Sequence, residues 1–378
     1  MEYGRLFVIF ENNKAGYMDA RGNVVIEPRF DAALDFHDGL ARICKRGSSP
    51  KAHRWGFIDT TGSIVIEPRF QGVDDFSEDR ALFQETDNFG YIDKTGEVRI
   101  KPIFHDASKQ NSIKGVPETP VEEMRFSEGL AAAQKSIFPK TVGYIDIDGE
   151  YVIEPQFRNC YRFSGGVTAV NSGELIKKWG LIDKTGSFIL EPQVKWPPRF
   201  SENLAGVRMN GQLGYIDESG KMVLEVPFDV AGSFHEGLAS VVRTKGRMNP
   251  DKWETGYIDK TGKTVIPLQF PAGKDFKDGL AAVKIDKKRR GYINREGNVV
   301  IGPLFYDAAG DFSEDMARVG IGFKFWGYIN RRGEEIVKPQ FKDAEDFKDG
   351  LARVAGGDWF GYIDKAGSMI YRAPLQSR

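Results

Sequence analysis

A short pattern that recurs ten times constrains the fold of this chain more than any other feature. Each copy begins with Gly, usually continues with an aromatic residue, Ile and Asp or Asn, and has a second Gly six residues after the first. The copies start at Gly16, Gly56, Gly90, Gly143, Gly180, Gly214, Gly256, Gly291, Gly327 and Gly361. Repeated residues are explained by the packing of one unit on the next before they are explained by chemistry. The pattern therefore predicts an architecture strongly and an activity weakly.

One unit is predicted to contain three short strands. In the copy that begins at Leu280, the strands are 280–285, 291–294 and 298–305, and polar turns separate them. The turn between the second and third strands has the form Asp259-Lys260-Thr261-Gly262, in which Asp accepts backbone hydrogen bonds and Gly takes a left-handed conformation. We expect an antiparallel meander in which these Asp residues stabilise turns.

The third strand carries an Ile-x-Pro-x-Phe signature, as in Ile26–Phe30. Because Pro cannot donate a hydrogen bond to a sheet, we expect pairing to stop there or the strand to present an unpaired edge. Three prolines lie one residue out of this register, which predicts a bulge or a bend at Pro227, Pro267 and Pro374.

A third signature, Phe-x-acid-Gly-Leu-Ala, connects one unit to the next, as in Phe276–Ala281. Where its Gly is replaced, the substitutes are Asp79, Asn203 and Asp315, which are residue types that tolerate positive φ. This position is predicted to be a left-handed turn residue.

The three signatures in this order resemble the bacterial WG-repeat (KWG-repeat) proteins. The resemblance covers nearly the whole chain, although Trp precedes the first Gly only at Trp55, Trp179 and Trp326. It implies a tandem β-repeat protein, usually of unassigned function, and carries over no catalytic residue.

The predicted fold is all-β, with ten three-stranded meanders stacked into an open, twisted, solenoid-like array. Propellers typically have 4–8 blades of four strands, so a closed propeller, or two propellers of five units, is the alternative. The whole chain is predicted to be one continuous array, with an inserted loop at 105–125. Its ten units are approximately 1–30, 31–70, 71–104, 105–157, 158–194, 195–228, 229–270, 271–305, 306–341 and 342–378.

Composition narrows the possible functions. The first residues lack the pattern of a signal peptide and no stretch is long and apolar enough to span a membrane, so we expect a cytoplasmic protein without a membrane partner. The two cysteines are too few for a disulfide scaffold or a Cys-rich metal site. No nucleophile motif, phosphate-binding loop or metal signature is present. We therefore expect no enzyme, no cofactor and no metal, although a catalytic site assembled from scattered loops stays an alternative.

Charge is sorted by position in the repeat. The loops 45–54, 243–252 and 284–290, between first and second strands, hold thirteen Lys or Arg and two Asp, whereas the connections 31–39, 71–79 and 306–315 hold eleven acids. Equal positions in a regular array lie along one edge, which predicts a basic margin and an acidic one. The alternative is that these turns are simply solvated. Candidate partner-binding residues are Lys45, Arg46, Arg54, Arg243, Arg247, Lys287, Lys288, Arg289 and Arg290.

Two interruptions of the repeat are further candidates for partner binding. The insertion 105–125 contains two prolines and a cluster of glutamates, and is predicted to be a mobile or partner-binding loop. Trp196 precedes two prolines and either anchors an interface or caps the local core.

Three classes of function remain. The first is a non-catalytic scaffold that binds another protein, including an inhibitor or an immunity-type protein. The second is binding of an anionic polymer, nucleic acid or polysaccharide, which would weaken steeply with salt. The third is an enzyme with a loop-assembled site.

Overall fold

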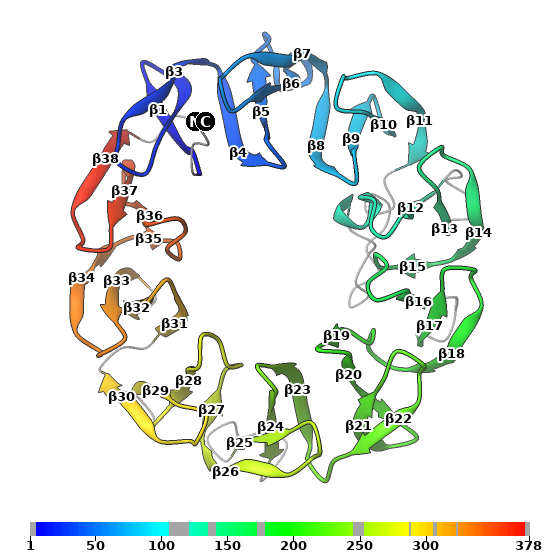
Figure 1. Ribbon diagram of the computed structural model, residues 1–378, viewed down its shortest axis with the longest axis vertical. Helices are drawn as coiled ribbons and strands as arrows, with labels where there is room; N and C mark the ends of the chain where they lie inside the picture. The colour runs from blue at the N-terminus through cyan, green and yellow to red at the C-terminus, as the bar shows by residue number, and fades with distance from the viewer. Residues whose placement is uncertain are drawn as a thin grey trace. The chain divides into compact units, whose positions relative to one another are not determined.

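The computed structural model describes residues 5–105, 121–134, 141–171, 178–244, 253–286, 289–304, 308–322 and 324–374. These residues form β-strands and two short 3-10 helices, η1 (Pro50–Ala52) and η2 (Val121–Met124). The chain divides into two compact units: unit 1 holds residues 1–19, 23–198 and 218–220, and unit 2 holds 20–22, 199–217 and 221–378. Each unit contains five small antiparallel sheets that follow one another along the chain (Figure 1).

The sheets are propeller blades, and strand positions within a blade are named a to d in chain order. Eight of the ten described sheets have four strands, whereas β1–β3 and β12–β14 have strands b, c and d only. Strands a are β4 (Ala32–His37), β8 (Gly72–Ser77), β15 (Asn159–Cys160), β19 (Phe200–Ser201), β23 (Val230–His235), β27 (Ala272–Gly273), β31 (Ala308–Ser313) and β35 (Asp343–Ala344). Strands b are β1 (Phe7–Glu11), β5 (Leu40–Lys45), β9 (Arg80–Glu85), β12 (Ala131–Ala133), β16 (Val167–Asn171), β20 (Leu204–Met209), β24 (Leu238–Thr244), β28 (Ala281–Lys284), β32 (Met316–Ile321) and β36 (Leu351–Ala355).

The other two positions complete each blade. Strands c are β2 (Lys14–Met18), β6 (Arg54–Asp59), β10 (Asn88–Ile92), β13 (Val142–Ile145), β17 (Trp179–Asp183), β21 (Gln212–Ile216), β25 (Trp253–Asp259), β29 (Arg290–Ile293), β33 (Phe325–Asn330) and β37 (Trp359–Asp364). Strands d are β3 (Val24–Phe30), β7 (Ile64–Phe70), β11 (Val98–His105), β14 (Tyr151–Phe157), β18 (Phe188–Val194), β22 (Met222–Glu225), β26 (Thr264–Phe270), β30 (Val299–Leu304), β34 (Glu335–Phe341) and β38 (Met369–Pro374).

The predicted open array of three-stranded repeats is therefore wrong, and the blades are those of a propeller, which was the alternative. The strands expected from the sequence are b, c and d. The missed strand a lies in the connection between repeats: Ala32 pairs with Cys44, and His37 with Leu40. It resembles a turn in sequence because it is short, acidic and interrupted by a register shift between Ala33 and Phe36.

Close approach of strand d explains the recurring Gly at the start of the pattern. In the blade of β25 and β26, Thr255 pairs with Phe270 and Tyr257 with Ile266, so Gly256 alone faces three residues of strand d. A Cβ atom on Gly256 would lie 2.5 Å from the carbonyl oxygen of Ile266. The Gly is required here for space and not for its backbone angles.

Of the two expectations about proline, the unpaired edge is confirmed, because strand d is the end strand of each sheet and pairs with strand c alone. Strand d continues through Pro28 to Phe30, with the same register shift opposite Gly16, so pairing does not stop at Pro. The shifted register is also present at Pro267, where a bulge was expected. It is absent opposite Gly214 and Gly361, because β22 ends before Pro227 and β38 runs in register to Pro374.

A buried tyrosine of strand c connects most blades to the next. Tyr257 donates its hydroxyl to the carbonyl oxygen of Lys274 in the following blade at 2.7 Å, and its ring packs against Phe276 with centroids 5.0 Å apart. Register shifts in strands a leave such carbonyls outside the ladder, as at Gly232 and Gly310. The same hydrogen bond joins Tyr17 to Leu34, Tyr91 to Met124, Tyr144 to Tyr161, Tyr215 to Gly232, Tyr292 to Gly310 and Tyr328 to Glu345.

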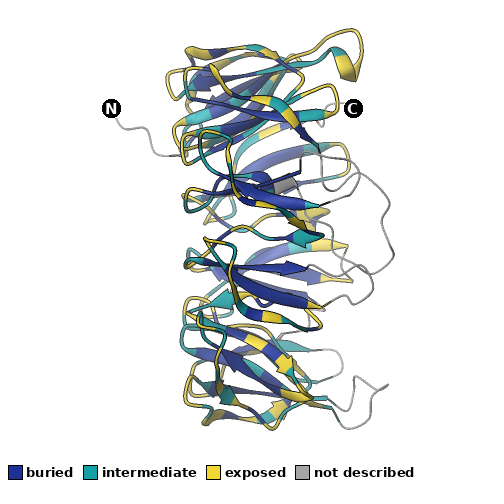
Figure 2. Cartoon of the chain, turned by 90° about the vertical axis from the view of Figure 1, so that its right-hand side faces the viewer, coloured by how far each residue is buried: buried dark blue, intermediate teal, exposed yellow. Residues whose placement is uncertain are grey.

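The core consists of clusters that each combine residues of adjacent blades. One cluster unites Tyr257, Ile266 and Phe270 of one blade with Phe276 and Ile293 of the next. Figure 2 shows strands that are mostly buried and connections that are mostly exposed. In these clusters of described residues, each blade packs its apolar side chains against a neighbouring blade, as expected for a repeat protein.

The end of the insertion belongs to this core. The described part, 121–125, contains η2, and Met124 is 2% exposed and accepts the hydrogen bond from Tyr91. It thereby makes the contact that strand a makes in other blades, which accounts for the three-stranded sheet β12–β14. The rest of the expected partner-binding loop 105–125, residues 106–120, lies outside the described residues.

Candidate functional site: the hairpin edge and its cavity

Antiparallel order gives every blade two different edges. We call the edge that carries the a–b and c–d turns the turn edge, and the edge that carries the b–c hairpins the hairpin edge. The basic loops predicted from the sequence are b–c hairpins, and two of them, after β24 and β28, belong to neighbouring blades of unit 2. The a–b turns of the acidic connections lie at the turn edge.

Carboxylates at the turn edge cap the turns of the next blade. Glu128 accepts hydrogen bonds from the amides of Gly165 and Gly166 at 2.6 and 2.9 Å. Both residues of an a–b turn have positive φ, which aims consecutive N–H groups at one anion. Equivalent bonds run from Glu128 and Gly129 to Glu78, from Gly237 to Glu202, from Gly279 to Glu236, and from Asp349 and Gly350 to Glu314. The predicted left-handed turn position is confirmed by these angles.

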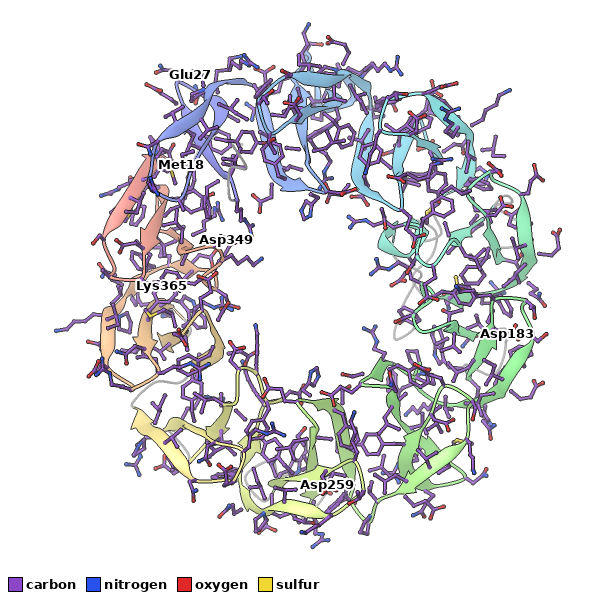
Figure 3. All side chains as sticks on the ribbon, in the orientation of Figure 1. Met18, Glu27, Asp183, Asp259, Asp349 and Lys365 are labelled. Carbon is purple, nitrogen blue, oxygen red and sulfur yellow. The ribbon has the colours of Figure 1, made fainter. Side chains whose placement is uncertain are left out.

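A basic residue of the c–d turn completes this contact. Lys184 lies 3.2 Å from Glu128, and Lys365 of the last blade lies 3.1 Å from Glu314 (Figure 3 labels Lys365). Burial alone raises the pKa of Glu128, but the two amides and Lys184 outweigh it, so the pKa of the carboxyl is lowered. We call this series of contacts the carboxylate ladder; it joins neighbouring blades within each unit.

The Asp of each c–d turn stabilises its own turn, as the sequence predicted. Asp259 accepts hydrogen bonds from the hydroxyl and amide of Thr261 at 2.6 and 2.9 Å, and these donors lower the pKa of the carboxyl. Asp183 makes the same contacts with Thr185. Asp183 and Asp259, both labelled in Figure 3, are the last residues of β17 and β25. These carboxylates therefore stabilise their own turns.

The predicted acidic margin is occupied by internal contacts. Ten of the eleven acids in the connections 31–39, 71–79 and 306–315 lie in the described part of the chain, and each has a partner there. Cations pair with Asp31, Asp35, Asp38, Asp74, Asp75, Asp79, Asp311, Glu314 and Asp315, and backbone amides bind Glu78. The sorting of acids by repeat position is therefore a consequence of blade packing.

The predicted basic residues make mainly local contacts. Arg54 donates to the carbonyl oxygens of Lys51 and His53 at 3.0 and 2.8 Å. Arg289 forms an ion pair with Asp286, and Arg243 lies over the ring of Phe228.

The remaining candidates are placed by their backbone or lie elsewhere. Lys45 ends β5 and is exposed, the amide of Arg46 donates to Asp31, and Arg290 begins β29. Arg247, Lys287 and Lys288 lie outside the described residues. Trp196 is 63% exposed, with the amine of Lys195 5.4 Å from its ring centroid, so it does not cap a core.

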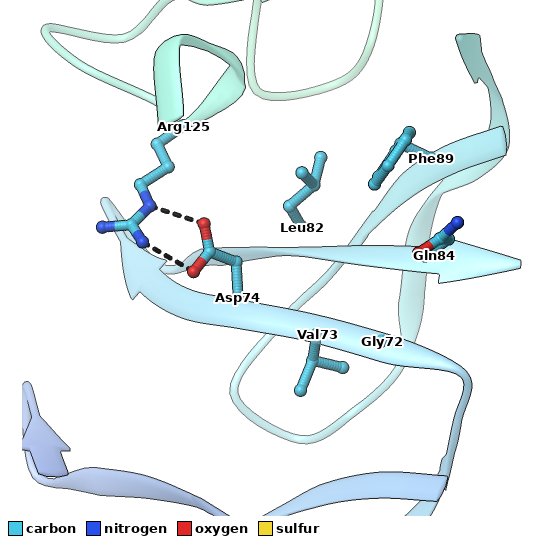
Figure 4. Close-up of a pocket in the computed structure, with 7 residues that line it drawn as sticks. All are labelled: Gly72, Val73, Asp74, Leu82, Gln84, Phe89 and Arg125. Carbon is cyan, nitrogen blue, oxygen red and sulfur yellow. Dashed lines mark hydrogen bonds and ion pairs between the residues drawn. The ribbon is translucent and has the colours of Figure 1, made fainter. Parts of the chain in front are cut away.

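A cavity of about 250 Å3 lies between β8, β9 and the segment before β12 (Figure 4). Asp74 and Arg125 line it and form a two-point ion pair, with both bonds at 2.6 Å. Burial opposes ionisation of Asp74, but Arg125 lowers the pKa of its carboxyl. Because the charges satisfy each other, this cavity offers little to a ligand.

A second cavity, of about 430 Å3, lies between β7 and β9 and includes a predicted site residue. We call it the Arg54 cavity. Its lining residues are Arg54, Arg69, Phe70, Gln71, Phe83, Gln84, Glu85, Val98 and Pro102. Sequence reasoning identified Arg54 from its basic loop but missed Arg69, because that residue belongs to strand d of the repeat.

Outside these cavities, few residues are candidates for catalysis or metal binding. His37 and His235 lie near Asp75 and Asp275, at 3.8 and 3.4 Å. Within the described ranges, no group of three or more His, Cys, Asp or Glu residues is placed to hold a metal ion. Neither does that part of the chain contain a helix with the length and hydropathy to cross a membrane.

Comparison with known families agrees with the repeat pattern. The model described as "WG containing repeat" matches nine segments, 16–47, 55–88, 89–109, 143–175, 179–212, 214–245, 256–288, 291–322 and 326–355. The chain belongs to the WG-repeat family. No curated protein matches it.

Solved structures share little sequence identity with this WG-repeat protein, and one of those compared resembles it in fold alone. A eukaryotic initiation factor has 10% identity and a TM-score of 0.52, with 98% of this chain and 96% of the other covered. The computationally designed Ika8 protein has 13% identity, a TM-score of 0.38 and coverages of 80% and 95%. Hsv2 of Kluyveromyces lactis has 11% identity, a TM-score of 0.37 and coverages of 66% and 96%.

Proposed function

We propose that this WG-repeat protein is a non-catalytic scaffold that binds another protein through its hairpin edge. One observation carries the proposal: the turn edge repeats the same contacts from blade to blade, whereas the b–c hairpins differ in length and charge. Between Lys45 and Arg54 the connection contains η1, but Met209 and Gln212 are joined by two residues, Asn210 and Gly211. Variable loops on a constant framework are the usual place of recognition.

The turn edge is a poor candidate for recognition because many of its charged groups already have partners in a neighbouring blade. Lys94, for example, bridges Asp38 and Asp79 at 2.7 and 2.9 Å. A partner bound there would have to displace contacts that join the blades. The hairpin edge carries cations whose contacts are within their own loops, as for Arg54 and Arg289.

The test replaces hairpins and keeps the blades. The two-residue Asn-Gly turn of β20 and β21 is grafted in place of the loops 46–53, 245–252 and 285–289. The wild-type protein, used as bait in extract of its native host, should capture a defined partner that the triple graft does not. Circular dichroism and melting temperature verify that the graft folds. Capture of the same partner by a folded triple graft would contradict the proposal.

Binding of an anionic polymer is the second candidate, favoured by the basic hairpins of the neighbouring blades of β24 and β28. It predicts that affinity for a nucleic acid or an acidic polysaccharide falls steeply between roughly 50 and 200 mM salt. A partner protein that remains bound across the same range distinguishes the first candidate from the second.

A further inference from the structure

Two arginines line the Arg54 cavity. Arg54 comes from the start of β6, and Arg69 from β7 of the same blade. Arg69 donates to the carbonyl oxygen of Gly96 at 2.5 Å and lies over the ring of Phe70 at 5.0 Å. Neither arginine forms an ion pair with a described residue.

Donors therefore remain for a ligand. The contacts of Arg54 use only Nη1, and those of Arg69 use only Nη2. The other N–H groups of both side chains have no partner in the part of the chain that the structure describes. Two guanidinium groups with spare donors suit a carboxylate, which accepts hydrogen bonds at both oxygens.

The other lining groups limit the charge of the ligand. Glu85, on β9 of the next blade, also forms no ion pair with described residues. The two arginines and Glu85 together give the cavity one net positive charge. This charge matches a single carboxylate better than a doubly charged phosphate, which Glu85 would repel.

Four apolar residues line part of the cavity. Phe70 and Phe83 are 8% and 3% exposed, with ring centroids 5.1 Å apart, and Val98 and Pro102 also line the cavity. These apolar lining residues suit the apolar part of a ligand that bears a carboxylate. Its volume of about 430 Å3 is within the range of roughly 300–1,000 Å3 that is typical of ligand pockets.

We propose that the Arg54 cavity binds the carboxylate of a Glu or Asp, with an adjacent apolar residue, in an extended segment of the partner protein. The proposal rests on the scaffold function and names the chemistry of the partner. A peptide is favoured over a free metabolite because one lining residue, Arg54, stands where a b–c hairpin meets β6, on the edge proposed for protein binding.

The experiment selects a random heptapeptide library displayed on phage against the full-length protein. The wild type should enrich peptides with an acid next to an apolar residue, and the double variant Arg54→Gln, Arg69→Gln should not. Affinity of a selected synthetic peptide should fall at least about tenfold in the double variant, as expected from the loss of charge-assisted bonds.

Arg29→Gln is the matched control. Arg29 has the same contacts one blade earlier, 5.0 Å over Phe30 and 2.5 Å from the carbonyl oxygen of Gly62, but it does not line the cavity. This variant should bind the selected peptide within about twofold of wild type. An equal loss in Arg29→Gln and the double variant would overturn the proposal, because the effect would then be on blade packing.

Two further outcomes distinguish the possibilities. Absence of acidic enrichment on the wild type overturns the cavity proposal even if host protein is captured, and leaves the scaffold function standing. Acidic enrichment that depends on both arginines supports the cavity even if no host protein is captured. Titration with N-acetylglutamate is the small-molecule arm: arginine-dependent binding of it without peptide enrichment also overturns the peptide proposal.

Discussion

Glycine has two distinct roles in this protein, and Gly256 and Gly279 are examples of each. Gly256 faces the carbonyl oxygen of Ile266 and the amide nitrogen of Leu268, at 2.5 and 2.8 Å from an added Cβ atom. Gly279 has a φ of +76° and nothing within 4 Å of an added Cβ atom. The first position is restricted by space, and the second by backbone conformation.

We predict different tolerances at the two positions. Gly256→Ala should destabilise the protein by about 1–3 kcal/mol, because the neighbouring groups that must move are backbone. Gly279→Ala should cost about 1–2 kcal/mol of conformational strain, and Gly279→Asn clearly less, since Asn203 occupies the equivalent turn position with φ +69°. Denaturant unfolding measures all three variants. An Asn variant at Gly279 as unstable as its Ala variant would contradict the assignment.

The contact between blades also depends on single hydroxyl groups. Tyr257→Phe keeps the ring against Phe276 but leaves the carbonyl oxygen of Lys274 without its donor. We expect a loss of about 0.5–1.5 kcal/mol in the free energy of unfolding, measured by denaturant unfolding.

The control comes from a blade that lacks the hydroxyl. Phe57 occupies the tyrosine position of its blade, and its ring packs against Phe76 with centroids 4.9 Å apart. Phe57→Leu therefore measures the contribution of ring packing alone. An unaltered stability in Tyr257→Phe would show that the hydroxyl does not help to join the blades.

At the scale of the element, the carboxylate ladder connects stability to pH. The folded-state pKa of Glu128 is lowered, and so is that of Glu314. A carboxyl whose pKa is lowered by folding stabilises the folded state above its unfolded pKa, and this stabilisation is lost as the pH falls through the folded pKa. The stability of the protein should therefore decline below about pH 4.5.

Glu128→Gln tests this relation. The variant should be less stable than wild type at pH 7, by under about 1 kcal/mol because the side chain is partly exposed. The difference should shrink toward about pH 2, where the wild-type carboxyl is protonated. Glu27→Gln on the outer strand β3, labelled in Figure 3, is the control and should track wild type at every pH. Melting curves across this pH range measure both; a constant difference for Glu128→Gln would contradict the ladder.

Much of each blade could be predicted from sequence because strands b, c and d carry strong local patterns. The Asp-Lys-Thr-Gly turn and the left-handed residue at Gly279 are where we expected them. Strand a could not be recognised, because its alternation is broken by a register shift and its acids contact residues of other blades. Arg42, for example, reaches Asp75 of the next blade. Such contacts join residues whose spacing in sequence carries no motif.

For the chain as a whole, we propose that the turn edge serves stability and the hairpin edge serves recognition. The basic hairpins were predicted from composition, and Arg54 lines a cavity. The pairing of the acids could not be predicted, because a single repeat does not show which residue of its neighbour it meets. The role of the hairpin residues in partner binding stays a prediction.

Charge reversal tests this division. The triple variant Lys45→Glu, Arg54→Glu, Arg243→Glu changes three hairpin-edge cations that form no ion pair with a described residue. Its free energy of unfolding should stay within about 0.5 kcal/mol per substitution of wild type. The variant Lys94→Glu at the turn edge should lose more, because Lys94 joins Asp38 to Asp79. Denaturant unfolding compares them, and equal stability of the two variants would argue against separate roles.

The tyrosine contact bears on how such a chain can lengthen in evolution. Tyr257 and the carbonyl of Lys274 are seventeen residues apart, within one continuous segment that spans two blades. A gene duplication that copies a segment from one strand b to the next strand a therefore copies a complete joint, with its donor and its acceptor. Duplication of one whole sheet, from strand a to strand d, would carry a tyrosine without the carbonyl that it had bound. The continuous segment that carries a complete contact in this protein therefore spans a junction between two blades and not one whole sheet.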